Sequence, residues 1–460
     1  MKFYGRERET SILLRQQDIV RKGGSRFVVL TGRRRVGKTR LILEALDSSK
    51  MPFIYDFVYK STSEERNVAI FSEVITDALH LDHPFKAESF EDALLFIFKR
   101  AEKEPIALIF DEFQNFDVVS PTMFETLQKL WDLHKNRMQL LLVVSGSVTS
   151  AIRNIFENGR APLYARQDVL LYLPPFTPTL LKKIFRDYCP NFDGETLLGL
   201  YILTGGVAQY VETMLEAGVF TTEGMIECLF NGSNRILSEA TTALAAEFKG
   251  NSAVYFDILR LIASGETKRS SLLTHFKEDI SGHLYRLEHV YRLIERVEPV
   301  GQTNGQRNRI RFEITDELLN FWFTFLEPKQ LYLEAGKSAQ IYRSVLAAFP
   351  EWSGRSLERF YRKHFESLGC FTEVGCWWDR KGLNEIDLIA VDDLSRKIVF
   401  CEIKRNEAKI DLNLLRVKAT EFVQLNPKYA SYRAVYRKLS LTELGGGIAS
   451  FLLPIPFSCL

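Results

Sequence analysis

The first 175 residues alternate short apolar runs with segments of helical periodicity. The runs cover residues 27–30, 53–58, 106–110, 139–144 and 169–173. Continuous apolar runs are typical of strands that are buried on both faces, and strands that alternate with helices form parallel sheets. The pattern therefore predicts an α/β domain with a parallel sheet over residues 1–175.

Helical periodicity continues from residue 176 to about 240, where we expect a helical segment. Beyond it, the pattern predicts three short helices and two apolar-rich strands, with the favoured hairpin turn Asn304-Gly305 between the strands. The helices are expected at 254–263, 268–276 and 280–290, and the strands around 293–297 and 310–314. This order is typical of a winged helix, which we place at residues 241–335. The aromatic stretch 321–325 is expected to be core, because neighbouring side chains on a helix point in different directions.

The last part of the chain, residues 340–460, has a further α/β pattern. Residues 384–391 and 397–404 are β-rich runs joined by the short polar segment 392–395, so they are predicted to pair as a hairpin. Helices are predicted around 356–360 and after Asp411. With this domain the chain has four predicted parts.

Composition narrows the class of protein. Lys and Arg total 60 and Asp and Glu 58 in 460 residues, a net charge of +2, which is not the surplus of a protein that coats nucleic acid. The charged N-terminus has no apolar segment of a signal peptide, and the last apolar stretch is short and broken by prolines. We therefore expect a cytoplasmic protein without a membrane contact. Six cysteines without metal-ligand spacing are expected to be reduced thiols.

A phosphate-binding loop of the form G-x-x-x-x-G-K-[ST] joins the first apolar run to a helical segment. It consists of Gly32, Arg33, Arg34, Arg35, Val36, Gly37, Lys38 and Thr39, and Arg40 follows it. Glycines let such a loop wrap around a polyphosphate, and the amides at the helix start point at its oxygens. Lys38 is expected to neutralise phosphate charge and Thr39 to ligate Mg²⁺, so the loop predicts ATP as the ligand.

Two carboxylates end the apolar run at 106–110. This Walker B pattern predicts Asp111 beside the magnesium and Glu112 where it polarises the attacking water. The run at 139–144 leads to Ser145-Gly146-Ser147. We expect its strand to lie between the two Walker strands, with Ser147 sensing the γ-phosphate; a plain turn at the strand end is the alternative.

These motifs together resemble the archaeal-type DEXX-box ATPases of the STAND class, which are AAA+-like P-loop proteins. The resemblance also includes the leading segment with Gly5 and Arg6, and Thr204-Gly205-Gly206 further on. It implies that Gly5 and Arg6 lie near the adenine and that residues 176–240 form a lid that closes on the nucleotide. Ala208 stands where the family usually has proline.

Two arginines match an arginine-bearing segment of the same family. The resemblance implies that Arg160 or Arg166 reaches a phosphate, in its own subunit or in a neighbouring one of a homo-oligomer. A plain surface position is the alternative for either residue.

The predicted winged helix has two candidate roles. Arg307, Arg309 and Arg311 near the turn and His283, Arg286 and His289 on the third helix favour contacts with DNA phosphates and a groove. In STAND-like ATPases, however, the resemblance equally implies a winged helix that packs inside the protein as a relay. Both roles stay open at this point.

Acidic and basic residues of the predicted C-terminal hairpin form a second constellation. Glu402 and Lys404 are two residues apart and share a face of their strand, opposite Asp387. Asp387, Glu402 and the Ile403 carbonyl are oxygen donors that suit Mg²⁺, with Mn²⁺ as a substitute, and Lys404 is placed to stabilise a hydroxide attacking a phosphodiester. Arg416 and Lys418 are expected to flank this site.

The hairpin resembles the PD-(D/E)XK nucleases. The resemblance implies that Glu358, on the helix at 356–360, is the helix-borne acid of that family and that the domain cuts DNA. Ile386 replaces the usual proline. The alternative is an inherited fold that binds DNA or a protein partner without cutting.

The sequence therefore predicts an ATP-binding and ATP-hydrolysing switch that acts on DNA. Its predicted parts are a P-loop core at 1–175, a helical lid at 176–240, a winged helix at 241–335 and a nuclease-like domain at 340–460. The competing hypothesis is a regulatory ATPase whose nucleotide state controls assembly with protein partners and whose last domain is a scaffold.

Overall fold

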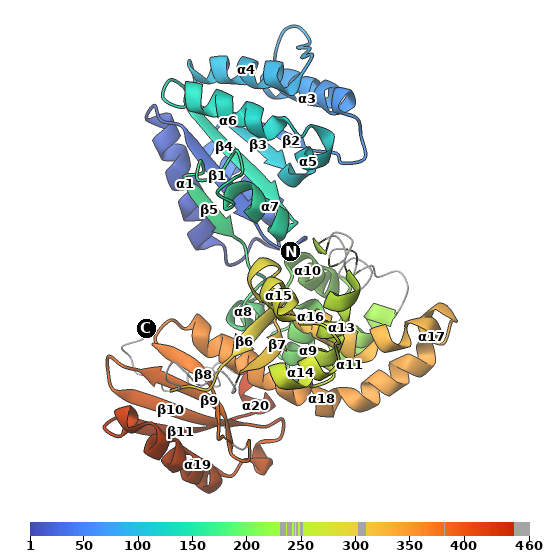
Figure 1. Cartoon of the computed structure of the whole chain (residues 1–460), viewed down its shortest axis with the longest axis vertical. Helices are drawn as coiled ribbons and strands as arrows, with labels where there is room; N and C mark the ends of the chain where they lie inside the picture. The colour runs from blue at the N-terminus through green and yellow to red at the C-terminus, as the bar shows by residue number, and fades with distance from the viewer. Residues whose placement is uncertain are drawn as a thin grey trace. The chain divides into compact units, whose positions relative to one another are not determined.

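The computed structural model describes residues 1–230, 236, 242, 244, 247–248, 252–301, 310–380 and 382–445 (Figure 1). The chain divides into two compact units. The N-terminal unit is Gly5–Pro175, and the C-terminal unit joins Met1–Tyr4 to Phe176–Leu460. No helix in the described part of the chain combines the length and the apolarity that a membrane span requires.

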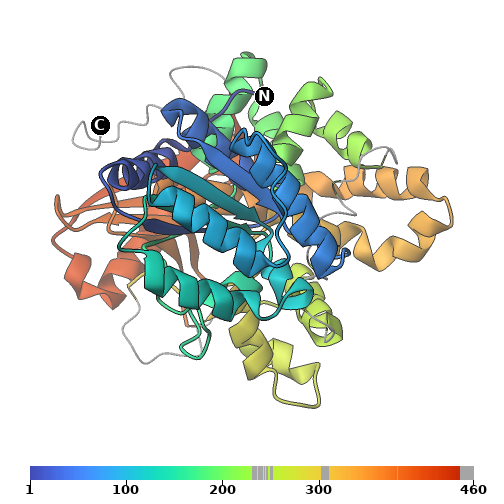
Figure 2. The ribbon, with the colours of Figure 1, turned by 90° about the horizontal axis from the view of Figure 1, so that it is seen from above.

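The N-terminal unit is built on a parallel five-stranded sheet with helices on both faces (Figures 1 and 2). Its strands are β1 (Arg26–Thr31), β2 (Phe53–Phe57), β3 (Ile106–Asp111), β4 (Leu140–Gly146) and β5 (Val169–Tyr172), in the order β2-β3-β4-β1-β5. The helices are α1 (Glu7–Arg21), α2 (Lys38–Ser49), α3 (Glu64–Ala78), α4 (Phe90–Ala101), α5 (Phe116–Val119), α6 (Met123–His134) and α7 (Thr149–Phe156). The predicted parallel sheet is confirmed, and β4 lies between the two Walker strands as expected.

The central strands of this sheet show why the apolar runs form strands. Every residue of β3 and β4 is buried. The sheet covers a core of phenylalanines, with Phe110 in edge or tilted contact with Phe71, Phe113 and Phe116. Because β1, β3 and β4 pair in parallel, their carboxyl ends meet at one edge of the sheet.

The C-terminal unit begins with four helices, as the helical periodicity predicts. They are α8 (Pro178–Tyr188), α9 (Gly194–Thr204), α10 (Ala208–Glu216) and α11 (Thr222–Phe230). Thr177 and Asp193 cap α8 and α9 through their side chains, and Pro178 occupies the first turn of α8. Helix α9 is buried along almost its whole length, which makes it the centre of this helical layer.

Three helices and a two-stranded sheet follow in the predicted order. They are α13 (Ser252–Ala263), α14 (Arg269–Thr274), α15 (Ser281–Tyr285), which continues as a π-helical turn over Arg286–Val290, and the antiparallel strands β6 (Ile294–Val297) and β7 (Arg311–Ile314). The turn Asn304-Gly305, Arg307 and Arg309 lie outside the described residues. In α16 (Glu317–Phe325), Phe321, Phe323 and Phe325 are buried, so the aromatic stretch is core as predicted.

The remaining elements are a four-stranded sheet and four helices, of which α18 (Ser338–Ser367) and α19 (Leu412–Leu425) are long and pack on the sheet. The other two helices are α17 (Gln330–Glu334) and α20 (Leu441–Leu444). The strands are β8 (Glu373–Trp378), β9 (Glu385–Asp392), β10 (Lys397–Ile403) and β11 (Arg433–Leu439), in the order β11-β10-β9-β8. Strands β9 and β10 pair antiparallel, which confirms the predicted hairpin, and β11 is parallel to β10.

Candidate functional site

The phosphate loop connects the end of β1 to the start of α2. Gly37 has a φ of +96°, in the left-handed region, and Gly32 has a φ of +153°. A Cβ on Gly32 would lie 2.5 Å from the carbonyl oxygen of Leu173. The loop therefore requires glycine at Gly32 for space and at Gly37 for backbone conformation.

Lys38 lies folded against its own loop. Its Nζ donates to the carbonyls of Gly32 (3.0 Å) and Arg33 (3.2 Å), and the side chain is buried. Burial lowers the pKa of Lys38, and the nearby Glu112 and Asp111 carboxylates oppose that shift. The ammonium thus lies at the phosphate loop, bound to the loop's own carbonyls.

Asp111 is held by several hydrogen bonds. Its Oδ2 accepts from the hydroxyls of Thr39 and Tyr55 (2.7 Å each), and its Oδ1 accepts from the hydroxyl of Ser145 and the amide of Glu112. Burial alone would raise the pKa of Asp111, but these donors keep it below its ordinary value. Thr39 and an ionised Asp111 side by side are the donor pair that suits Mg²⁺. Sequence reasoning missed Tyr55 and Ser145.

Glu112 follows in a strained backbone position, with a φ of +54°. Its Oε2 accepts from the Ser147 hydroxyl at 2.7 Å and from the Gln114 amide. The residue predicted to sense the γ-phosphate therefore lies within hydrogen-bond reach of the predicted base. The structure brings Lys38, Thr39, Asp111, Glu112 and Ser147 together at one edge of the sheet.

The leading segment also reaches the loop. Gly5 has a φ of +60°, and the buried Arg6 donates to the carbonyls of Pro174 (2.8 Å) and Val36 (3.4 Å). Burial lowers the pKa of Arg6, with the carboxylates of Glu9 and Glu7 acting in the opposite direction. Arg6 therefore braces the phosphate loop; a contact with adenine stays a prediction.

The other arginines of this unit differ in surroundings. Arg34 and Arg40 are exposed beside the loop, and Arg160 is exposed on the segment after α7. Arg166 is bound to Asp132 of α6 through Nη2 (2.9 Å) and Nε (3.1 Å), and it donates to the Pro162 carbonyl at 2.7 Å. The described contacts thus make Arg166 a structural tie, whereas a phosphate contact of the exposed Arg160 stays a prediction.

The C-terminal constellation also converges. Asp387 Oδ2 accepts from the Ile403 amide at 2.7 Å and lies 3.2 Å from Lys404 Nζ, which is 3.4 Å from Glu402 Oε1. Lys418 of α19 reaches Glu402 Oε2 at 3.1 Å, so it flanks the site as predicted. Residues far apart in the sequence meet here at the ends of β9 and β10.

Glu358 completes this group from α18. Burial, with the Asp387 carboxylate beside it, raises the pKa of Glu358 to about 8. Burial also raises the pKa of Asp387, an effect that Lys404 opposes and Glu402 supports. For Lys404, burial alone would lower the pKa, but Asp387 and Glu402 raise it overall. Positive charge near Glu358 and Asp387 would favour their ionised forms.

The groups that could hold a metal ion at this site are the carboxylates of Asp387 and Glu402 and the carbonyl of Ile403. No group of three or more His, Cys, Asp or Glu side chains within the described ranges is arranged to hold a metal ion. Instead, Lys404 and Lys418 both pair with the Glu402 carboxylate, and Lys404 also pairs with Asp387. Oxygen donors of this kind suit Mg²⁺, but in this structure the carboxylates are paired with lysine ammonium groups.

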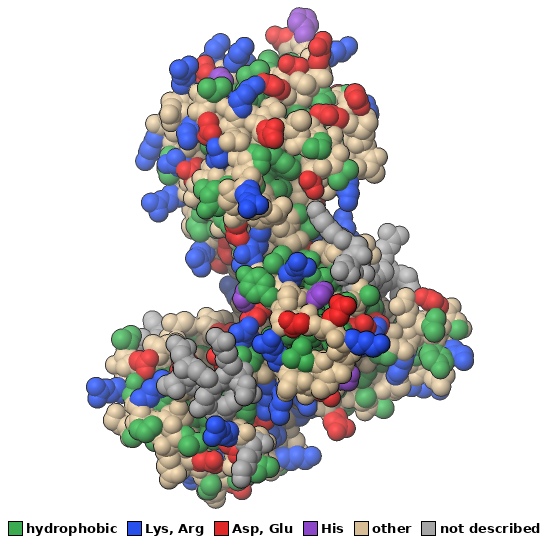
Figure 3. All heavy atoms as spheres, viewed as in Figure 1, with side chains coloured by type: hydrophobic (Ala, Val, Ile, Leu, Met, Phe, Trp, Pro, Cys, Tyr) green, Lys and Arg blue, Asp and Glu red, His purple; other side chains and the backbone are tan. Residues whose placement is uncertain are grey.

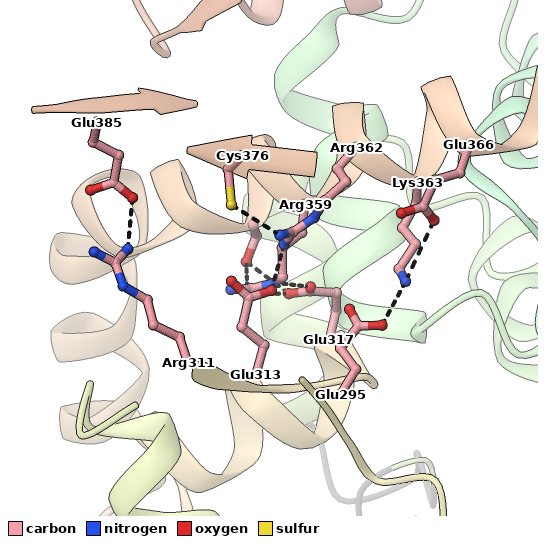
Figure 4. Close-up of polar contacts among 11 residues, drawn as sticks. Glu295, Arg311, Glu313, Glu317, Arg359, Arg362, Lys363, Glu366, Cys376 and Glu385 are labelled. Atoms are coloured by element: carbon pink, nitrogen blue, oxygen red, sulfur yellow. Dashed lines mark hydrogen bonds and ion pairs between the residues drawn. The ribbon is translucent and has the colours of Figure 1, made fainter. Parts of the chain in front are cut away.

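Acidic residues of the middle segment face α18 (Figure 4). The pairs are Glu295 with Lys363 (2.8 Å), Glu313 with Arg362 (2.5 Å) and Glu317 with Arg359 (2.5 and 2.8 Å). The Val300 amide also donates to the Cys376 carbonyl of β8 at 2.9 Å. Ion pairs and a hydrogen bond therefore hold the segment of β6 and β7 against α18 and β8.

Arg311 is engaged within the C-terminal unit. It is paired with Glu385 at 2.7 Å (Figure 4), and its guanidinium carbon lies 4.0 Å from the ring centre of Trp378. These contacts favour the internal relay role at this position, and a contact of Arg311 with DNA phosphates stays a prediction.

The third helix has a more open surface. Tyr285, Arg286 and His289 are exposed, and Arg286 reaches the Tyr255 hydroxyl at 3.3 Å. His283 lies beside the Tyr255 ring, 5.1 Å between ring centres. On the face shown in Figure 3, acidic and basic side chains are interspersed. A groove contact by the exposed part of this helix stays a prediction.

Known proteins similar to this chain match it in two places. Residues 3–214 match a family described as an ATPase domain predominantly from Archaea, and residues 322–418 match a family of archaeal and bacterial proteins of unknown function. The first match covers the phosphate loop, Asp111, Glu112 and Ser147. The protein is an ATPase.

One sequence relative matches almost the whole chain, and two solved structures are similar to about three quarters of it or slightly less. An uncharacterized protein of Methanocaldococcus jannaschii is 24% identical over 96% of this chain and 93% of its own length. A Walker-type ATPase of Pyrococcus abyssi has a TM-score of 0.50 at 19% identity, covering 70% of this chain and 96% of its own. The ORC2 protein of Aeropyrum pernix, solved with ADPNP and ADP, has a TM-score of 0.49 at 15% identity, and the match covers 75% of this chain and 96% of the ORC2 chain. The Pyrococcus likeness shows the fold of a P-loop ATPase with a parallel five-stranded sheet.

Proposed function

We propose that this ATPase is a switch of the STAND class that binds DNA and cuts it with a divalent metal at the C-terminal site. The convergence of Glu358, Asp387, Glu402 and Lys404 is the observation that carries the proposal. A strand aspartate, a Glu-x-Lys strand and a helix-borne acid are the parts of a PD-(D/E)XK site. Their meeting supports the nuclease-like reading of residues 340–460.

Nucleotide is proposed to bind in the phosphate loop, with Lys38 on its phosphates and Thr39 and Asp111 as the residues that would hold Mg²⁺. The metal would supply positive charge for the developing charge on the phosphates. Lys38 has to leave the Gly32 and Arg33 carbonyls to reach the nucleotide. Glu112 accepts the proton of the attacking water.

At the second site, Asp387, Glu402 and the Ile403 carbonyl would hold Mg²⁺ or Mn²⁺, which would supply a hydroxide and polarise the phosphodiester. A bound cation would take over the charge compensation that Lys404 and Lys418 now give to the carboxylates. Lys404 is then free to stabilise the attacking oxygen. Glu358 would lose its proton as the positive charge arrives.

DNA is proposed to approach through the exposed side of α15, where Arg286 and His289 lie. Since β6 and β7 are fastened to α18, residues 252–325 and the last domain would meet DNA together. The open side of α15 favours direct contact for this helix, and the paired Arg311 favours the relay role for the strands.

The second candidate is a regulatory ATPase with a non-catalytic last domain that binds protein partners or DNA. The pairing of the candidate ligands with Lys404 and Lys418, and the lack of a three-residue ligand group in the part of the chain that is described, favour it. In this case the exposed Arg160 would serve assembly into a homo-oligomer.

Nicking of supercoiled circular DNA, with Mg²⁺ or Mn²⁺ and with or without ATP, separates the two candidates. The nuclease proposal predicts nicking that Asp387→Asn and Lys404→Ala abolish. Glu407→Gln, which changes an exposed carboxylate a few residues beyond the site, is the matched control and should cut as the native protein does. Nicking that survives Asp387→Asn, or none with either metal, rejects cleavage at this site and favours the scaffold.

A further inference from the structure

Gln114 lies beside the predicted base of the ATPase reaction, as the last residue of the segment Asp111-Glu112-Phe113-Gln114, and the sequence predicts no role for it. It is on the short 3₁₀ turn Phe113–Asn115 that follows β3, and its side chain is buried. Its Nε2 donates to Glu112 Oε2, the same oxygen that accepts from Ser147. One carboxylate oxygen of Glu112 is thus capped by two donors.

The surroundings leave Gln114 little freedom. Its Oε1 is buried and has no hydrogen-bond partner among the described residues, and a Cβ on Gly146 would lie 2.3 Å from it. The amide is therefore confined against the backbone of β4, with its donor end turned to an acceptor-only carboxylate. A buried amide that leaves its own oxygen unsatisfied is costly to keep, which points to a role for the bond that it does make.

The backbone of Glu112 is fixed in the same place. The residue has the left-handed φ of +54°, its amide donates to Asp111 Oδ1 at 2.9 Å, and its carbonyl accepts from the Asn115 amide at 2.8 Å. Backbone and side chain are thus both held, and Glu112 Oε1 is the carboxylate oxygen without a donor in the described contacts.

We propose that Gln114 is a positioning residue for ATP hydrolysis: it holds Glu112 so that Oε1 faces the attacking water. In the step itself, the water proton passes to Oε1, the water oxygen bonds to the γ-phosphorus, and the bond to the bridging oxygen breaks with its electron pair leaving on ADP. Glu112 then returns the proton to solvent. Ser147 can turn to the γ-phosphate while Gln114 keeps Glu112 in place.

The test is steady-state ATP hydrolysis by the full chain carrying Gln114→Met, which keeps the length of the side chain but removes the donor. We expect kcat to fall about 10- to 100-fold, the size of one hydrogen bond to a charged group, with KM and the affinity for ADP unchanged. Gln114→Glu also keeps the shape but sets a like charge beside Glu112, so it should lose at least as much. In a Glu112→Gln background, Gln114→Met should cause little further loss.

ADP affinity and the thermal unfolding midpoint of each variant separate positioning from folding damage. The proposal is overturned if Gln114→Met or Gln114→Glu retains native kcat. It is also overturned if the variants lose ADP binding in parallel with kcat, or if Gln114→Met causes the same loss with Glu112→Gln present.

Discussion

Loss of one partner of the buried pair Glu317–Arg359 is predicted to destabilise the C-terminal unit strongly. Glu317 is 2% exposed and Arg359 9% exposed, and two N–O contacts of 2.5 and 2.8 Å join them. Arg359→Met leaves the Glu317 carboxylate buried with only the Ser356 hydroxyl as a donor among these contacts. Breaking a buried pair by removing one partner costs about 3 to 5 kcal/mol.

Replacing both partners should recover most of that loss. In Glu317→Met with Arg359→Met neither charge of this pair remains to be desolvated, so we expect stability within about 1 to 2 kcal/mol of the native protein. The control is Arg260→Met in the same unit. Arg260 pairs with Glu327 but is 45% exposed, and such a pair contributes at most about 1 kcal/mol.

Urea unfolding followed by tryptophan fluorescence measures these changes in the right unit. Four of the five tryptophans, Trp322, Trp352, Trp377 and Trp378, lie in the C-terminal unit, and Trp131→Phe silences the other one. A free energy of unfolding for Arg359→Met within about 1 kcal/mol of the native value, which is the size of a surface ion pair, would contradict this prediction. A double variant no more stable than the single one would also refute it.

Three further predictions concern the N-terminal unit. Thr39→Val keeps the shape of the side chain but removes the hydroxyl that donates to Asp111. It should lower Mg²⁺-dependent ATP hydrolysis at least about tenfold and leave metal-free ADP binding, measured by calorimetry, intact. Hydrolysis at the native rate would contradict the assignment of Thr39 to Mg²⁺. Burial raises the pKa of Asp56 to about 7, so the folded protein keeps a proton that the unfolded chain loses near pH 4, and stability should fall as pH rises from about 4 to 7. Asp56→Asn should flatten that slope in urea titrations; an unchanged slope would contradict the shift. Gly32→Ala should lower both the unfolding temperature and ADP affinity, because its Cβ meets the Leu173 carbonyl at 2.5 Å; native affinity would show that the loop has room.

The sequence was informative where function resides in contiguous residues. The loop from Gly32 to Thr39 and the strand ending at Asp111 could be placed because their spacing and flanking pattern define them. The position of β4 between the Walker strands also followed, since a sensor at the carboxyl edge must lie near both motifs.

Contacts between distant segments could not be predicted. Tyr55 meets Asp111 from a neighbouring strand 56 residues away, and nothing in its local sequence indicates this bond. Arg311 has a charge that suits DNA as well as it suits Glu385, 74 positions further on, and only the packing of β7 on the last domain decides between them. Charge patterns give the type of partner but not its identity.

The proposed switch function predicts that nucleotide in the phosphate loop changes the affinity for DNA, and the affinity for a labelled DNA duplex with ATP, with ADP and without nucleotide tests it directly. The native protein is predicted to have different dissociation constants in these states, and Lys38→Ala the same constant in all three. Equal DNA affinity of the native protein in every nucleotide state would contradict the account.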